Sequence, residues 1–505
     1  MEKLSKNMKR TGFWITILLA WMCVATAQAQ IERPKLVVGI VVDQMRWDYL
    51  YTYYNNWGQG GFRRLIDQGF SLDNTLIDYV PTVTAAGHAS IYTGTTPAIH
   101  GIAGNDYMLH GSPTSSVRDT TVAGVGTNTS TGKRSPRNLL ATTIGDQMKL
   151  ATDFQARVVG VAIKDRAAVL PAGHAADGAY WFDGKVKRFV TSTYYCKELP
   201  QWLSRFNNEH QELLAGDLWN SWRGAAATMQ LACAAIEGEQ LGTDDVPDLL
   251  AISISSTDAA AHNYGLHVPR VDSIYYELDR QMARFFDLLD RKVGKGQYLV
   301  FLSADHGGTY TEPFMTGHRM VTGCWNPSQA FKDTNAALEA KFGVPRLLKS
   351  EMEFSFYLDN DLIAARGLDR DAVADEAVRL LSAPDEVQWV VDFAHLDRYV
   401  LPADLRERLV KGYKQDRSGE LFIIPTVGVY ARYRPDAGAN HGTWSQSDSH
   451  IPFVMMGWGV PHGATSRQVA MTDIAPTVCA LLHIQAPNGC IGRPVTEITD
   501  QSIKR

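Results

Sequence analysis

Several features that would place this chain in a common class of protein are missing from its sequence. The longest apolar run, GFWITILLAWMCVATA, has 16 residues, fewer than the roughly 20 that a membrane-spanning helix needs. There is no Cys-x-x-Cys pair, which argues against a thiolate zinc ribbon. Basic residues are not in excess, with 49 Lys and Arg against 54 Asp and Glu, so nothing indicates a nucleic-acid partner.

The first 29 residues have the pattern of a secretory signal peptide. A basic start, MEKLSKNMKR, precedes the apolar run, and Ala27-Gln28-Ala29 is a small-x-small cleavage site. The alternative, a retained membrane anchor, is disfavoured because the run is short. We therefore predict a periplasmic or secreted protein without a stable membrane anchor, whose formal net charge falls from −5 to −8 when residues 1–29 are removed.

Five cysteines follow that segment, an odd number for a chain in an oxidising compartment. At most two disulfides can form within the chain. Cys479 and Cys490 are close in sequence, but spacing alone does not establish the geometry of a bridge, and the pairing stays open.

Three apolar runs that lead to aspartates are the main clue to the fold. KLVVGIVVDQ leads to Asp43, PDLLAISISSTDAAAH to Asp258 and His262, and GQYLVFLSADHGG to Asp305 and His306. Each run is rich in Val, Ile and Leu and does not alternate in polarity, which is typical of strands covered on both faces of a parallel sheet. Ligands bind beyond the carboxyl ends of such strands, so we expect these side chains at one edge of the sheet.

Other patterns complete an α/β fold with a central, mostly parallel sheet flanked by helices. Residues 267–292 space their apolar side chains at helical intervals. ARVVGVAIKDRAAVL is predicted to be a strand on which Lys164 and Arg166 share one face. HIPFVMMGWGV is predicted to be the final buried strand.

A long segment with its own helical and strand patterns separates the last of the three runs from NHGTWSQSDSHIP. We predict that residues 326–436 are an inserted cap region, since insertions on a large α/β scaffold commonly build a pocket wall. The catalytic core is then formed by residues 30–325 and 437–505.

Carboxylates and imidazoles brought to one sheet edge indicate a metal site. They would repel one another and be costly to desolvate unless a cation neutralised them, and their oxygen and nitrogen atoms suit Zn²⁺. A catalytic zinc usually keeps three protein ligands, so six ligands make two sites. One predicted trio is Asp43, Asp305 and His306, and the other is Asp258, His262 and His441.

Two zinc ions about 4 Å apart form a clamp for displacement at phosphorus, which favours phosphoryl transfer. If the path is covalent, Thr84 in Thr-Ala-Ala-Gly-His is the candidate nucleophile, because the positive end of a following helix favours its alkoxide. Lys164 and Arg166 are assigned to the nonbridging oxygens of the transferred group, and Asn105 is a further donor to them. Two cations suit a dianionic monoester better than a monoanionic diester.

Each of these residues also has a purely structural interpretation. Aspartates at strand ends commonly stabilise turns, and a threonine at a loop–helix junction is commonly an N-cap. Their recurrence on three strands favours the metal site. His450 competes with His441, but it precedes Ile451-Pro452 at a strand entry, where a structural histidine is common, and His88 is assigned to holding its loop by hydrogen bonds.

With these residues identified, the chain resembles the alkaline phosphatase superfamily, most closely its phosphate-irrepressible bacterial alkaline phosphatase branch, whose core is like that of the nucleotide pyrophosphatases/phosphodiesterases. The matching segments, between about residues 36 and 477, are GIVVDQMRWDYL, TVTAAGHASIYTGTTPAIHGIAGND, IKDRAAVLPAG, STDAAAHNYG, SADHGG, NHGTWSQSDSHIP and TDIAPT.

The resemblance implies a secreted zinc-dependent alkaline phosphatase, a phosphoric monoester hydrolase with two zinc ions per chain. It implies that one ion is held by Asp43, Thr84, Asp305 and His306, and the other by Asp258, His262 and His441. It also implies that Asn105, Lys164 and Arg166 hold the phosphoryl group of a small phosphate monoester. In this family a phosphorylated nucleophile, here a phosphothreonine, forms and is then hydrolysed.

Two alternatives stay open. One is a phosphodiesterase or nucleotide pyrophosphatase on the same scaffold, although such relatives generally lack the Lys and Arg pair. The other is a noncatalytic metal-binding surface protein, which would bind zinc without turnover. A sulfatase is disfavoured because the Cys-x-Pro-x-Arg pattern is absent. The regions 107–140 and 326–436 match the family only loosely, so the specificity for the leaving group is not predicted.

Overall fold

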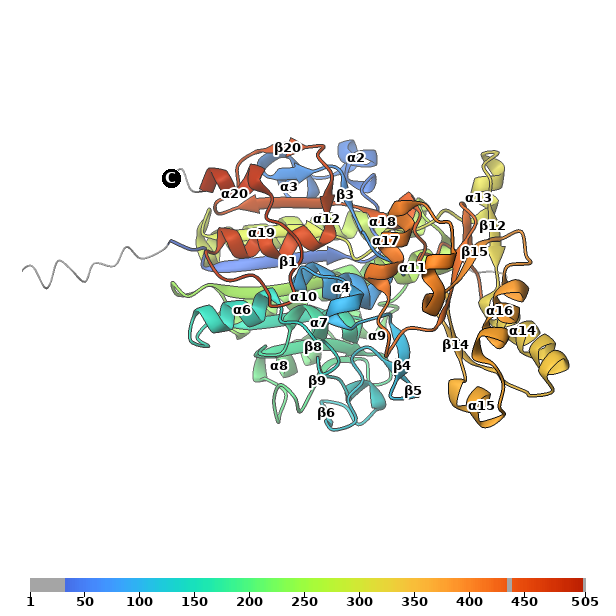
Figure 1. The fold of residues 1–505 in the computed structure, drawn as a ribbon. Helices are drawn as coiled ribbons and strands as arrows, with labels where there is room; N and C mark the ends of the chain where they lie inside the picture. The colour runs from blue at the N-terminus through green and yellow to red at the C-terminus, as the bar shows by residue number, and fades with distance from the viewer. Residues whose placement is uncertain (1–31, 434–437, 503–505) are drawn as a thin grey trace, which may run out of the picture. The chain divides into compact units, whose positions relative to one another are not determined.

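Three fully buried strands form the centre of the computed structural model, which describes residues 32–433 and 438–502. They are β1 (Leu36–Val42), β10 (Asp248–Ile254) and β11 (Tyr298–Ser303). All three run parallel and lie side by side with β1 in the middle. The strands predicted from the three apolar runs are therefore confirmed, and their carboxyl ends meet at one edge of the sheet (Figure 1).

The sheet around these strands is parallel at its centre and antiparallel towards both sides. Beyond β10 it continues in parallel through β7 (Val158–Ala162) and β8 (Gly178–Asp183). Antiparallel neighbours then follow on each side. The full order is β20 (Gly463–Thr465), β2 (Phe70–Leu72), β19 (Phe453–Gly457), β11, β1, β10, β7, β8, β9 (Arg188–Ser192) and β6 (Gly124–Val125).

Helices cover both faces of this sheet, which explains why successive residues of the central strands are all buried. On one side α10 (Trp222–Gly238) packs against β10 and α12 (Pro269–Leu289). On the other, α4 (Thr84–Thr93) packs against α7 (Asp165–Ala172) and α19 (Ile474–Leu481) (Figure 1). The helix predicted at 267–292 and the α/β class are thereby confirmed.

The strand predicted to carry Lys164 and Arg166 on one face ends too early for that, and this prediction was wrong. β7 stops at Ala162, Lys164 occupies the N-cap position, and Arg166 lies in the first turn of α7. The apolar residues that follow belong to a buried helix, whose composition resembles that of a buried strand. The helix lies so close to β7 that a Cβ on Gly160 would be 2.2 Å from Ala168 O.

HIPFVMMGWGV forms β18 (His450–Ile451) and β19, and β19 is the last strand that is buried along nearly its whole length. β20 and β21 (Val469–Ala470) follow it and pair with β2 and β3 (Thr75–Leu76). These strands have three and two residues, too few to produce an apolar run.

A second sheet, here called the cap sheet, lies in the range predicted as an inserted cap. Its order is β13 (Leu348–Met352), β14 (Ser355–Leu358), β16 (Leu421–Pro425) and β15 (Val387–Asp392). It has its own hydrophobic core, which includes Phe356, Val391 and Leu409. The helices of this segment include α14 (Pro327–Phe342), α16 (Arg370–Leu381) and α17 (Ala403–Gly412).

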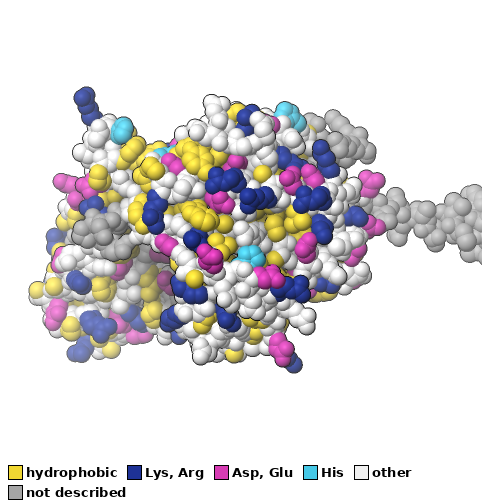
Figure 2. All heavy atoms as spheres, turned by 180° about the vertical axis from the view of Figure 1, so that it is seen from behind, with side chains coloured by type: hydrophobic (Ala, Val, Ile, Leu, Met, Phe, Trp, Pro, Cys, Tyr) yellow, Lys and Arg dark blue, Asp and Glu magenta, His cyan; other side chains and the backbone are white. Residues whose placement is uncertain are grey.

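The predicted signal peptide lies outside the described residues. The chain from Pro34 onward forms one compact unit. Within the described ranges, no helix has the length and apolar character needed to cross a membrane. All five cysteines in those ranges are free. On the face shown in Figure 2, Lys and Arg side chains are interspersed with Asp and Glu.

Candidate metal centre

Three aspartates meet at the carboxyl edge of the central sheet. Asp43 follows β1 directly, Asp305 lies two residues beyond β11, and Asp258 lies in the first turn of α11 (Ser256–Tyr264), which follows β10. All three side chains are buried. Burial raises the pKa of Asp43 well above its usual value, and the charge of Asp305 raises it further. Carboxylates buried this close together need compensating positive charge.

His306 faces two of these carboxylates. Its Nε2 lies 3.5 Å from Asp43 Oδ1 and 3.5 Å from Asp305 Oδ2. These three side chains are one of the predicted ligand trios, and their candidate ligand atoms all lie within 4.8 Å of one another. The structure therefore brings this trio together as expected.

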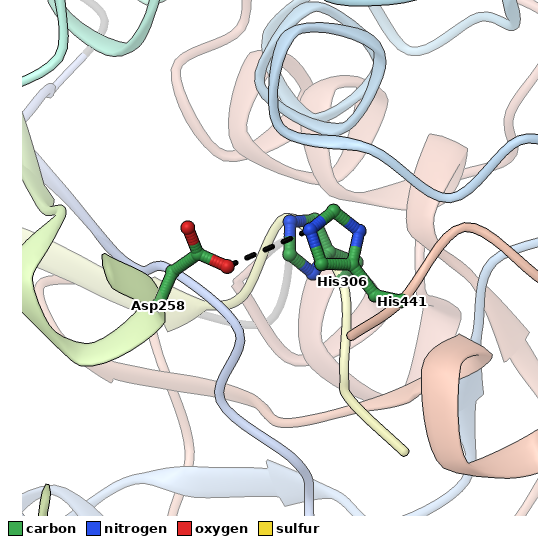
Figure 3. A group of neighbouring side chains, drawn as sticks. All are labelled: Asp258, His306 and His441. Carbon is green, nitrogen blue, oxygen red and sulfur yellow. Dashed lines mark ion pairs between the residues drawn. The ribbon is translucent and has the colours of Figure 1, made fainter. Parts of the chain in front are cut away.

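Two further histidines face Asp258. Nε2 of His262, one helical turn away on α11, lies 3.1 Å from Asp258 Oδ1, and Nε2 of His441 lies 3.5 Å from the same oxygen. The ring of His441 stacks on that of His306, with centroids 3.6 Å apart, and both lie beside the Asp258 carboxylate in Figure 3. Asp258, His306 and His441 form a second group of ligand atoms within 4.8 Å, so His306 also adjoins the trio of Asp258, His262 and His441 predicted from the sequence.

The other ring nitrogen of each histidine is held by the backbone. Nδ1 donates a hydrogen bond to a carbonyl oxygen in every case: His306 to Gly307 O (2.9 Å), His262 to Ala439 O (2.9 Å) and His441 to Thr82 O (2.7 Å). A carbonyl oxygen only accepts, so Nδ1 carries the proton and Nε2 presents its lone pair to the carboxylates. Metal-binding histidines are commonly oriented in this way.

A cation fits this set of donors. Asp43 Oδ1, Asp258 Oδ1 and Asp305 Oδ2 are buried and accept no hydrogen bond from the described residues. Burial also lowers the pKa of His306 and His441, which keeps both imidazoles neutral and able to bind a metal. Unpartnered carboxylate oxygens beside imidazole lone pairs match the ligand chemistry of a divalent ion such as zinc.

Lys164 supplies the positive charge that the described residues bring into this cluster. Its Nζ donates to Asp43 Oδ2 at 2.7 Å and to Asp258 Oδ2 at 2.6 Å. Burial lowers the pKa of this ammonium, but the charges of Asp258 and Asp43 outweigh burial and raise it. The side chain predicted to meet a substrate group therefore also bridges two candidate metal ligands.

Thr84 lies at the same point, as the first residue of α4. Its Oγ1 accepts a hydrogen bond from Lys164 Nζ at 3.2 Å and lies 3.5 Å from His306 Nε2. The helix reaches this position because Gly87 has no side chain, since a Cβ there would lie 2.2 Å from Asp305 O. A buried hydroxyl at a helix N-terminus, next to a cation, is in a favourable place to ionise.

Asn105 is oriented from both sides. The backbone N–H of Ala85 donates to Asn105 Oδ1 at 3.0 Å, and the Asn105 side chain also forms a hydrogen bond with the Glu353 carboxylate. Arg166 has its Nε buried without a hydrogen-bond partner in the described residues, and its guanidinium is 3.8 Å from Asp165. Asn105 is thus held next to the start of α4, and Arg166 has an unused donor.

Glu353 is a residue of this region that the sequence analysis missed. It comes from the turn between β13 and β14 of the cap sheet, and both of its carboxylate oxygens accept from the backbone N–H of Asn105, at 3.1 and 3.0 Å. Burial raises the pKa of this carboxyl to about 7. Nothing in the local sequence signals this contact, because 248 residues separate the two partners.

His88, which the sequence analysis assigned to structure, and His450, which it weighed against His441, both have partners of their own, and His88 Nδ1 also lies 3.3 Å from Asp305 Oδ2. His88 donates and accepts within the core, through Thr84 O and Ser253 Oγ, each at 2.8 Å. His450 stacks on Trp47 and bonds Asp73 O at 2.9 Å. His441, which the sequence analysis preferred over His450, is the one that faces Asp258.

Comparisons with known proteins agree with this geometry. Residues 37–448 match the model of the type I phosphodiesterase / nucleotide pyrophosphatase family. Alkaline phosphatase PafA of Elizabethkingia meningoseptica is 42% identical, over 95% of this chain and 97% of that protein. Its crystal structure superposes with a TM-score of 0.89, covering 93% of this chain and 99% of that one.

Two further relatives match over nearly their whole length. Alkaline phosphatase PhoV of Synechococcus elongatus is 38% identical over 93% of each chain. A protein of Myroides odoratus named calcium-transporting ATPase is 41% identical, over 97% of this chain and all of that protein.

Proposed function

This chain belongs to the alkaline phosphatase superfamily, in its type I phosphodiesterase / nucleotide pyrophosphatase family, and we propose that it is a zinc-dependent alkaline phosphatase that acts through a phosphothreonine at Thr84. It is a phosphoric monoester hydrolase, like its relatives PafA and PhoV. The observation that carries the proposed mechanism is the convergence of three buried carboxylates, three imidazole lone pairs and the Thr84 hydroxyl at one sheet edge.

We assign the metal ligands as two neighbouring sets of side chains. Asp43, Thr84, Asp305 and His306 hold one zinc ion, and Asp258, His262 and His441 hold the other. When bound, the two ions neutralise the carboxylates, polarise the phosphoryl oxygens and favour the ionised hydroxyl. The unpartnered carboxylate oxygens and the Nδ1–carbonyl bonds support this assignment.

The remaining residues bind and orient the substrate. The Thr84 oxygen forms a bond to phosphorus, and the oxygen of the leaving group departs with the electron pair of the bond that breaks. Asn105 Nδ2, Lys164 and the Arg166 guanidinium donate to the nonbridging oxygens, where charge is held in the transition state. Water then releases phosphate from Thr84.

The preference for monoesters follows from the two cations, since a monoester dianion carries one more charge than a diester. A phosphodiesterase or nucleotide pyrophosphatase activity is the second candidate, and the name of the matching family model favours it. Comparing the turnover of an aryl phosphate with that of an aryl phosphodiester separates the two, and faster diester turnover contradicts the monoesterase.

Export to the periplasm or the medium is part of the proposal, and it rests on the pattern of residues 1–29. Sequencing the N-terminus of the protein recovered from the cells that make it tests this point. A chain that begins after Ala29 supports export, and an intact N-terminus contradicts it.

Hydrolysis of p-nitrophenyl phosphate by the mature chain tests the proposed mechanism. We expect turnover that requires zinc, falls by about 10³-fold or more in Thr84→Ala, and is largely kept in Thr84→Ser, which retains a hydroxyl. An acid quench is expected to trap a phosphorylated enzyme in wild type and in Thr84→Ser but not in Thr84→Ala. Unchanged turnover in Thr84→Ala contradicts the nucleophile, and zinc binding without any turnover would indicate a noncatalytic protein.

A further inference from the structure

A cleft of about 850 Å³ opens beside the residues assigned to the phosphoryl group. Its walls come from the hairpin of β4 (Asp106–Leu109) and β5 (Ser112–Ser115), from the segment 118–134 and from Met352. None of the predicted metal ligands lines it. The cleft is therefore a separate space from the metal centre.

The cleft nevertheless borders the phosphoryl-binding residues at three points. Asp106 in its wall directly follows Asn105, and Met352 directly precedes Glu353, the residue that holds Asn105. Arg134 forms an ion pair with Asp165, which lies between Lys164 and Arg166. A substrate bound at Thr84 thus has the cleft next to its phosphoryl group.

Three cations gather on the wall formed by segment 118–134. Arg118 and Arg134 face each other across an antiparallel backbone bridge, and Lys133 adjoins Arg134. Like charges placed opposite each other in this way are unfavourable. Arg134 is neutralised by Asp165, but the side chains of Arg118 and Lys133 are exposed and form no ion pair or hydrogen bond with the described residues. This wall therefore carries two positive charges without a partner.

The other groups at the cleft are suited to an oxygen-rich anion. Ser115 and Ser130 bring hydroxyl groups to it, whereas the hydroxyl of Thr129, which also lines it, donates to Asp183 Oδ2. The carboxyl that lines it, Asp106, has its pKa raised by burial, although the charge of Arg166 opposes this. Guanidinium, ammonium and hydroxyl donors together match the oxygens of a phosphate.

We propose that this cleft binds a second phosphate carried by the leaving group, so that the enzyme prefers phosphoanhydrides and related substrates, such as a nucleoside diphosphate, over monoesters with a neutral leaving group. The proposal rests on the function proposed above, because it needs the terminal phosphoryl group at Thr84. In the reaction the terminal phosphorus gains an oxygen from water, by way of Thr84. The bridging oxygen leaves with its electron pair on the remaining phosphate, so that ADP and water yield AMP and orthophosphate.

The test compares kcat/KM for ADP, inorganic pyrophosphate, AMP and p-nitrophenyl phosphate in the zinc-loaded enzyme. In the double variant Arg118→Gln/Lys133→Gln, we expect the ratio of kcat/KM for ADP to that for p-nitrophenyl phosphate to fall about 10- to 100-fold. The ratio for pyrophosphate is expected to fall likewise, since the contact is to phosphate and not to the nucleoside. The ratio for AMP should stay within about twofold.

The matched control is Arg284→Gln/Arg291→Gln, which removes two exposed positive charges from α12 and from the short π-helix after it (Asp290–Gly294), at residues that form no ion pair with the described residues. It changes the net charge equally, so it reports any long-range electrostatic effect. A control that lowers the ADP ratio as much as the cleft variant overturns the proposal. A cleft variant that leaves the ADP and pyrophosphate ratios unchanged overturns it as well.

Binding gives a second readout that does not depend on turnover. Calorimetric titration of zinc-loaded Thr84→Ala with ADP and with AMP is expected to give tighter binding of ADP, and the cleft substitutions are expected to remove that difference. Equal affinity for ADP and AMP contradicts the cleft even if the protein hydrolyses monoesters. Lack of any monoester turnover in wild type, with ADP still bound more tightly than AMP, contradicts the proposed function and leaves the cleft supported.

Discussion

Charged side chains are arranged in opposite ways at the carboxyl edge of the central sheet and on the exposed faces of the cap helices. At the sheet edge, Asp43, Asp258 and Asp305 are buried, and Lys164 reaches two of them from a distant element. On the cap helices, acids pair with close neighbours at the surface, as Glu376 does with Arg379 three residues on. Exposed local pairs contribute little to stability, whereas buried charges without full compensation are costly. The comparison shows that the buried, incompletely compensated charges lie where the chemistry is proposed.

Removing metal is the strongest way to test this contrast. Because the ligands are arranged by folding, metal binding stabilises the folded state, so excess chelator is expected to abolish turnover and lower the melting temperature. Hydrogen exchange is the measurement that separates the regions: protection should fall in the segments after β1 and β11 and remain in β15 and β16 of the cap sheet. Zinc added back is the control. Full activity after prolonged chelation contradicts the metal centre.

Replacing Lys164 by Met removes the cation between Asp43 and Asp258. In chelator, where no metal compensates, we expect the free energy of unfolding to fall by about 3–5 kcal/mol, as when one partner of a buried ion pair is deleted. With zinc bound the loss should be smaller. Urea unfolding in both conditions measures it, and Arg379→Met, which breaks a surface pair on the cap, is the control expected to show little change. Equal losses with and without zinc would contradict the idea that a bound metal can replace the positive charge of Lys164.

Arg166→Ser is expected to harm monoesters more than diesters. The substitution removes a planar donor from the second nonbridging charge, which only the monoester dianion carries, so kcat/KM for an aryl phosphate should fall about 10- to 100-fold. The loss for an aryl phosphodiester should be clearly smaller. Lys197→Ser, at an exposed lysine, controls for the lost charge. The same loss on both substrates contradicts the assigned role.

Glu353→Gln has the smallest expected effect. It tests the contact through which the cap sheet reaches Asn105 beside the metal centre. Burial raises the pKa of this carboxyl from 4.5 to about 7, so the folded state binds more protons than the unfolded state between these values. Its contribution to stability is therefore complete below pH 4.5 and is lost as the pH rises through 7. The loss amounts to at most about 3 kcal/mol, because the side chain is only partly buried and water screens it.

Urea unfolding of wild type and Glu353→Gln at pH 5 and pH 8.5 measures this contribution. We expect the variant to lose less stability than wild type between the two conditions. Glu339→Gln, at an exposed glutamate of α14, is the matched control. A variant with the same pH dependence as wild type contradicts the raised pKa of Glu353.

Local sequence determined much of the core and part of the site. Apolar runs of strand length predicted β1, β10 and β11, since strands covered on both faces must be apolar throughout. Asp43 and the Asp305-His306 pair follow those strands within three residues, so the positions of the strands also fixed where these side chains lie. The i, i+4 spacing of Asp258 and His262 correctly predicted one helical face, now seen in α11.

Tertiary structure decided what these side chains meet. A run such as VVGVAIKDRAAVL is apolar whether it is a strand or a buried helix, so only packing on the sheet ended β7 at Ala162 and put Lys164 at the N-cap position of α7. Which histidine serves which carboxylate, the contact of Glu353 with Asn105 and the gathering of Arg118 with Arg134 each join residues distant in sequence. Such contacts arise from how elements pack against one another, and no periodicity within a single segment encodes them.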